Sequence, residues 1–115
     1  MIIRSQDKKY LVNMGNISIY AMDREVICFD TSGIEDSGYI SLGYYETEEK
    51  ALKVLDMIQE AYAEVELTKL TIPEIGKTFK EAPATEENEL LAKAVGEVLR
   101  KKMVFQMPED SEVEV

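Results

Sequence analysis

The fold of this 115-residue chain is decided by one stretch, Ile17-Ser18-Ile19-Tyr20-Ala21-Met22-Asp23-Arg24-Glu25-Val26-Ile27-Cys28-Phe29-Asp30. Its first six residues alternate with the period of two that is typical of a β-strand. Asp23-Arg24 predicts a tight turn, and the apolar run after it predicts a second strand. The stretch therefore predicts an antiparallel hairpin.

Shorter strand patterns lie on both sides of this hairpin. Ile2-Ile3-Arg4 and Tyr10-Leu11-Val12-Asn13-Met14 precede it, and Tyr39-Ile40-Ser41-Leu42-Gly43-Tyr44-Tyr45 follows an acidic loop at 30–36. The short connections predict that residues 1–45 form an antiparallel β-meander of about five strands. The acidic spacing does not follow a calcium-binding loop, which favours a solvated hairpin loop over a calcium site.

One face of such a sheet needs a cover, and a helix predicted over 47–66 supplies it. Thr47 is a typical N-cap residue, and acidic residues fill the first turn. Apolar residues follow at a helical period: Ala51, Leu52, Leu55, Ile58, Tyr62 and Val65. The segment 67–84 is interrupted by Pro73, Gly76 and Pro83 but carries large apolar residues, so we expect an ordered excursion there.

A second helix is predicted over 85–102, with Thr85 as its cap and cations in its last turn. Its apolar stripe consists of Leu90, Leu91, Ala94, Val95, Val98 and Leu99. A short strand at 103–107 and an acidic tail at 108–115 follow. We therefore expect an α+β fold in which one domain spans residues 1–115.

Composition restricts the chemistry that the chain can perform. Histidine is absent, so neither a Ser-His-Asp device nor a zinc site of the Cys/His kind can be built. The carboxylates form no distinctive catalytic pair, and we expect no enzyme, no metal and no cofactor. The net charge of −10 argues against a nucleic-acid polymer as ligand, but it is compatible with a small anion in a local basic pocket.

Cellular location is indicated by cysteine use and by hydropathy. Cys28 is the single cysteine, which suits a reducing compartment, and its position in the strand pattern predicts that it is buried. No basic leader precedes an apolar core, and no apolar run approaches the ~20 residues that span a bilayer. We expect a cytoplasmic protein without a membrane partner.

The best candidate for anion recognition is Arg100-Lys101-Lys102 with nearby Phe105, since cations and a stacking aromatic ring occur together. The alternative is that these cations only complement the dipole at the end of the helix. Phe79 between Lys77 and Lys80 could line a pocket, but packing against the core is the favoured interpretation. Arg4 and Arg24 are expected at the surface.

Three stretches resemble small proteins encoded by phages and prophages of Gram-positive bacteria: Met1-Ile2-Ile3-Arg4-Ser5-Gln6, Glu49-Lys50-Ala51-Leu52-Lys53-Val54-Leu55-Asp56-Met57-Ile58, and Phe105-Gln106-Met107-Pro108-Glu109-Asp110. Within that group, the size and the order of sheet and helices resemble the Thoeris anti-defence sponges of type one. That resemblance implies a homo-oligomer that binds and sequesters a cyclic ADP-ribose signal in the host cytoplasm without cleaving it. The implied pocket draws on Phe79, Asn88, Arg100, Lys101, Lys102 and Phe105.

The negative charge leaves a second function class open. An acidic protein-binding inhibitor, which mimics nucleic acid to block a host defence protein, would also need no catalytic group. The charge of −10 and the acidic residues after Pro108 favour this alternative.

Overall fold

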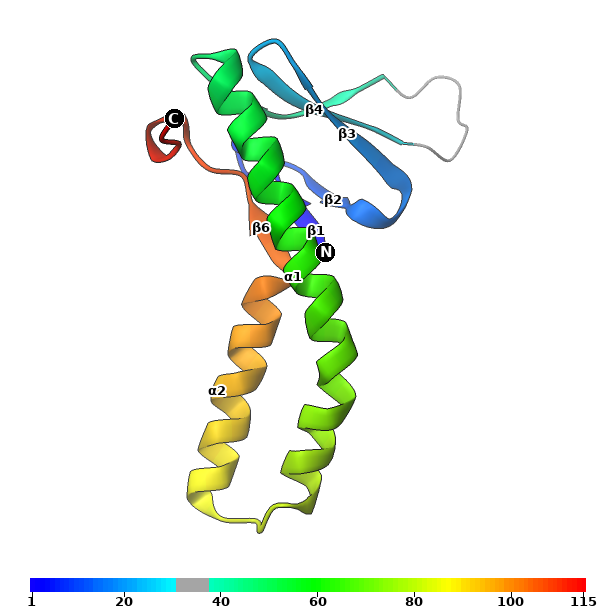
Figure 1. Cartoon of the computed structure of the whole chain (residues 1–115), viewed down its shortest axis with the longest axis vertical. Helices are drawn as coiled ribbons and strands as arrows, with labels where there is room; N and C mark the ends of the chain where they lie inside the picture. The colour runs from blue at the N-terminus through cyan, green and yellow to red at the C-terminus, as the bar shows by residue number, and fades with distance from the viewer. Residues whose placement is uncertain (31–37) are drawn as a thin grey trace.

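The structure, a computed structural model, describes residues 1–30 and 38–115 and confirms the α+β class (Figure 1). The five expected N-terminal strands are present, and they divide between two sheets. The strands are β1 (Ile2–Arg4), β2 (Leu11–Asn13), β3 (Ile17–Met22), β4 (Glu25–Asp30), β5 (Ile40–Tyr44) and β6 (Val104–Gln106). The helices are α1 (Glu48–Glu81) and α2 (Glu86–Lys102), with short 3-10 turns at Met14–Asn16 and Asp110–Glu112.

The first sheet has the order β2-β1-β6 and joins the two ends of the chain. β1 pairs antiparallel with β2 and parallel with β6, so that Ile3 lies opposite both Val12 and Phe105. Pairing of β1 with β6 places β1 and β2 in a different sheet from β3, β4 and β5. A local sequence pattern carries no information about such a pairing, because its two strands lie at opposite ends of the sequence.

The second sheet has the order β3-β4-β5 and contains the predicted hairpin of residues 17–30. Asp23 takes a φ of 53°, the left-handed conformation that a tight hairpin turn uses. β5 pairs antiparallel with β4 through a bulge between Val26 and Ile27. The loop at 30–36, and with it the calcium alternative, lies largely outside the described residues.

The core lies where the two sheets, the first half of α1 and the C-terminal segment meet. It takes in Ile3, Val26, Cys28, Leu42, Tyr45, Ala51, Val54, Ile58, Met107 and Val113. Cys28 is buried, as expected, and burial raises the pKa of its thiol. Val54 takes the core position that the sequence assigned to Leu52, which is exposed. α1 covers one face of the sheet. On the other face Tyr20 is exposed, whereas its cross-strand partner Ile27 is buried.

The prediction of a helix over 47–66 followed by an excursion over 67–84 is wrong, because α1 continues without interruption to Glu81. Pro73 lies inside the helix, where it removes one backbone donor. Both Lys69, whose carbonyl loses that bond, and Pro73 are exposed to water. The helix ends just before Pro83, whose ring disfavours helical geometry at the preceding residue.

Packing against α2 explains why the segment is helical. The half-buried residues of this part of α1 recur at a spacing of three and four residues along one side: Thr68, Ile72, Ile75 and Phe79. The half-buried residues of α2 show the same spacing: Asn88, Ala92, Val95 and Leu99. The two stripes form the seam of an antiparallel hairpin, and this tertiary contact outweighs the local cost of proline.

The hairpin projects away from both sheets (Figure 1). It makes the molecule 54 Å long with a radius of gyration of 17.5 Å, whereas a compact chain of this length has about 13 Å. The predicted caps are confirmed, since the side chains of Thr47 and Thr85 accept hydrogen bonds from the backbone N–H groups of Lys50 and Asn88.

The expected acidic tail at 108–115 is instead folded against the body of the protein. Pro108 and Val113 are buried. Asp110 accepts a hydrogen bond from the Glu46 N–H at 2.7 Å and forms a salt bridge with Lys50 at 3.1 Å. Apolar residues between the carboxylates anchor the segment. The prediction of an acidic tail was based on charge alone and did not take these residues into account. Within residues 1–30 and 38–115, neither helix combines the length and apolar character needed to cross a bilayer.

Candidate functional site

The six residues assigned to a ligand pocket lie in separate places. Phe79 and Asn88 flank the turn at the far end of the hairpin, whereas Arg100, Lys101 and Lys102 form the last turn of α2. Asn88 and Arg100 are more than three helical turns, about 18 Å, apart. The structure does not bring the six residues into one pocket within a single chain.

Three of these residues have structural contacts that account for them. The side-chain amide of Asn88 donates to the Pro83 carbonyl at 2.7 Å and closes the turn between the helices. Phe105 packs against the core cluster. Phe79 is half-buried and belongs to the stripe of α1 that faces α2. These contacts favour the core-packing and capping interpretations over ligand contact.

The three cations at the end of α2 are exposed and complement the helix dipole. Arg100 borders a shallow hollow of about 330 Å³, which is lined by Lys93, Gly96 and Glu97 of the same helix. A single helix surface cannot enclose a ligand, and Glu97 offsets part of the positive charge. In one chain this hollow is a poor nucleotide site.

A stronger candidate lies on the face of the β3–β4–β5 sheet opposite α1. Tyr20 of β3 and Phe29 of β4 meet edge to face with ring centroids 5.6 Å apart, and Phe29 meets Tyr39 at 6.2 Å. The three rings cross three neighbouring chain segments. Tyr20 is 51% exposed and Tyr39 is 54% exposed, so both can contact a ligand.

Strand register explains why these rings gather. Side chains alternate across a strand, so the core positions Ile17, Ile19 and Ala21 place Tyr20 on the outer face. The diagonal contact between Tyr20 and Phe29 is of a kind that stabilises antiparallel sheets. We call the row Tyr20, Phe29 and Tyr39 the aromatic face.

Arg24 adds a cation at the opposite end of the same sheet. Its guanidinium lies 5.4 Å from the Tyr44 ring centroid, and it donates a hydrogen bond to the Tyr44 hydroxyl at 2.9 Å. Tyr39 and Tyr44 are separated by roughly 17 Å of extended strand. A hollow of about 480 Å³ beside Arg24 is also lined by Asp23, Glu25 and Glu48, which offset its charge.

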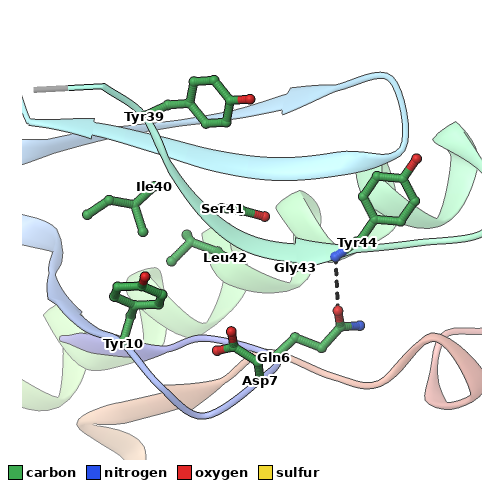
Figure 2. A pocket seen from close by; sticks show the side chains of 9 residues that line it. All are labelled: Gln6, Asp7, Tyr10, Tyr39, Ile40, Ser41, Leu42, Gly43 and Tyr44. Carbon is green, nitrogen blue, oxygen red and sulfur yellow. Dashed lines mark hydrogen bonds between the residues drawn. The ribbon is translucent and has the colours of Figure 1, made fainter.

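A cavity of about 440 Å³ lies between β5, the edge strand of its sheet, and the turn after β1. Figure 2 shows Tyr39 on one side of β5, with Tyr10 and Asp7 across the gap on the other. Gln6 joins the two sheets here: its N–H donates to the Leu42 carbonyl at 2.7 Å, and its side-chain oxygen accepts the Tyr44 N–H at 2.9 Å.

Asp7 gives this cavity a negative charge. Hydrogen bonds from the Ser5 hydroxyl at 2.6 Å and from the Lys9 N–H at 3.0 Å lower the pKa of Asp7 below its ordinary value of 3.8. A carboxylate held in its charged form repels phosphate and accepts N–H donors. The cavity therefore suits the amine-bearing edge of a ligand better than its anionic part.

The aromatic face could have been found in the sequence, but aromatic residues are common in strands. Tyr39 and Tyr44 within a strand pattern therefore do not by themselves indicate a binding surface. The stronger signal is Tyr20, a large ring at an outward position of the alternating strand Ile17–Met22. Tyr45, by contrast, is buried in the core.

Comparisons with known proteins add no assignment to this geometry. No family model matches the chain, and neither the curated proteins nor the solved structures searched include a match. Among the described residues, no group of three acidic, cysteine or histidine side chains is placed to hold a metal ion.

Proposed function

We propose that this protein sequesters a cyclic nucleotide signal of the cyclic ADP-ribose type without cleaving it, acting as a phage anti-defence protein in the bacterial cytoplasm. The proposal follows the family resemblance for the biological role. One observation carries it at the molecular level, namely the exposed aromatic face, which offers stacking surfaces to a base. Self-association is part of the proposal.

Stacking suits a sponge because affinity is needed and turnover is not. Every base presents a π-face, and stacking one base on an aromatic side chain contributes about 1–3 kcal/mol. Cyclic ADP-ribose carries a single base, so the stacking surface of the aromatic face is what the proposal requires. Arg24, roughly 17 Å away along the strand, is not assigned a role in it. The six residues implied by the resemblance are not needed for this mode of binding.

Calorimetry of the purified protein against cyclic ADP-ribose isomers and cyclic oligonucleotides tests the proposal. We expect binding to one class, and a loss of about 1–3 kcal/mol per base in Tyr20→Ala or Tyr39→Ala. Tyr62→Ala is the matched control, since this tyrosine of α1 is 40% exposed and lies outside both the aromatic face and the neighbouring cavity. The proposal fails if no compound produces heat with the wild-type protein.

The second candidate, an acidic inhibitor of a host defence protein, is favoured by the net charge of −10. Such a complex would form through long-range attraction to a basic partner. Its association should weaken steeply between low and high ionic strength. Stacking of a small ligand on tyrosine changes much less with salt, so pull-down from host extract at two salt concentrations separates the two candidates.

A further inference from the structure

We propose that α2 is a dimerisation helix that pairs antiparallel with α2 of a second copy of this chain. α2 has 17 residues, none of which is buried in the monomer. The half-buried residues of α2 face α1. The apolar residues predicted from the sequence cover a wider part of the helix surface than this contact with α1. Leu90, Leu91 and Val98 are 62%, 55% and 55% exposed, although such residues are usually buried in a helix.

The exposed side of α2 has the spacing of a helix–helix seam. Glu87, Leu91, Ala94, Val98 and Lys101 follow one another at intervals of four, three, four and three residues. This is the a/d repeat with which two helices pack side chains into each other's holes. In the described part of the chain no element covers this side, so a partner is required to bury it.

Charge identifies the partner and its direction. Glu87 and Lys101 lie seven residues before and seven residues after Ala94 on the same side of the helix. An antiparallel second copy with its two-fold axis at Ala94 places Glu87 against Lys101 of the partner twice. It also places Leu90 and Leu91 against Val98, and the small Ala94 allows close approach at the axis.

A parallel pair is disfavoured by the same residues. It would bring Glu87 next to Glu87 and Lys101 next to Lys101, together with the acidic first turns and the basic last turns of both helices. The antiparallel pair also cancels the two helix dipoles. Two hairpins joined this way form a four-helix arrangement. Each helix is already formed in the monomer, so association does not have to meet the cost of helix nucleation.

The seam is independent of the ligand proposed above, because α2 projects away from the sheet that carries the aromatic face (Figure 1). The seam gives a structural basis to the self-association in the proposed function. Failure of ligand binding would leave the dimer intact, and a monomeric protein would remove self-association from the proposed function but leave ligand binding at the aromatic face to be tested by itself. The two proposals are therefore tested separately.

Light scattering after gel filtration gives the first test. We expect a mass about twice that of the 13.1 kDa chain. Glu87→Lys and Lys101→Glu should each weaken the dimer roughly tenfold, because both charge pairs become repulsive. The double variant Glu87→Lys/Lys101→Glu should restore the wild-type dissociation constant. A monomeric wild-type protein, or single variants that dimerise normally, would overturn the antiparallel seam.

Cross-linking gives a second test that does not depend on affinity. Ala94→Cys should form a disulfide-linked dimer under mild oxidation, since the seam brings the two copies together at this position. Gly96→Cys is the matched control, because a side chain there meets no atom within 4 Å and points away from the seam. The native Cys28 is buried and does not compete. Equal cross-linking of both variants, or of neither, would contradict the proposal.

Discussion

At the residue scale, Tyr45 and Gly43 show how closely the C-terminal segment is fitted to the sheet. Tyr45 is 1% exposed and donates its hydroxyl to the Pro108 carbonyl at 2.8 Å. Burial, together with the acidic residues after Pro108, raises the pKa of Tyr45 far above its usual value. The phenol therefore stays neutral and acts as a hydrogen-bond donor between two segments that are distant in sequence.

Gly43 should not tolerate a side chain. A Cβ atom would lie 3.0 Å from the Tyr45 hydroxyl oxygen and 3.3 Å from the Met107 methyl carbon. We expect Gly43→Ala to destabilise the fold by about 1–3 kcal/mol in urea unfolding. Gly96→Ala, on the open side of α2, should instead stabilise it by about 1 kcal/mol. Changes of the same sign at both glycines would contradict the packing described.

Asp110 should make stability depend on pH. Hydrogen bonds from the Glu46 N–H and from Lys50 lower the pKa of Asp110 below its ordinary value of 3.8. A lowered pKa contributes stability above the unfolded-state value, and this contribution disappears as pH falls through the folded-state value. Asp110→Asn should therefore be less stable than the wild type at pH 7, and the difference should narrow at pH 3.

Urea unfolding at both pH values measures this difference. Asp56→Asn, which changes an exposed carboxylate in the first half of α1, controls for the loss of one negative charge. An Asp110→Asn deficit that is the same at pH 7 and pH 3 would rule out the ionic role of this carboxylate.

At the element scale, local signals predicted the helix starts well and one helix end poorly. Thr47 and Thr85 identified both N-caps because capping is a property of four neighbouring residues. Pro73 and Gly76 predicted a break that does not occur, since the seam between Ile72, Ile75 and α2 is formed by residues distant in sequence. The aromatic face was missed for a related reason: it is assembled from β3, β4 and the residue that precedes β5.

Pro73 should be a local weakness in α1. Proline in a helix interior lacks a hydrogen-bond donor and costs up to about 3 kcal/mol. Because Pro73 is exposed, we expect Pro73→Ala to raise the free energy of unfolding and to increase the helical signal in circular dichroism. Pro83→Ala, just beyond the end of α1, is the control and should change neither. A less stable Pro73→Ala variant would argue against a continuous α1.

At the scale of the whole molecule, the chain consists of a compact body and a projecting hairpin (Figure 1). The sequence predicted the body in outline, because its strands and first helix carry clear periodicities. It could not predict the elongated shape, which depends on α1 continuing through Pro73 and on the width of the apolar surface of α2. The body presents the aromatic face, and the hairpin presents the proposed seam.

The separation of the aromatic face from the proposed seam predicts the stoichiometry of ligand binding. The dimer proposed above joins two chains through their hairpins and leaves both aromatic faces exposed at the outer ends. Calorimetry should then give one ligand per chain, without cooperativity between the two sites. A ratio of one ligand per two chains would place the binding site at the dimer interface instead, where Arg100–Lys102 would be the relevant cations.

Mapping of amide chemical shifts by NMR shows whether the aromatic face binds the ligand. Unlabelled cyclic ADP-ribose isomers are titrated into the ¹⁵N-labelled full chain. We expect shifts confined to the neighbourhood of Tyr20, Phe29 and Tyr39. Shifts confined to the last turn of α2, or no shifts with any isomer, would contradict binding at the aromatic face.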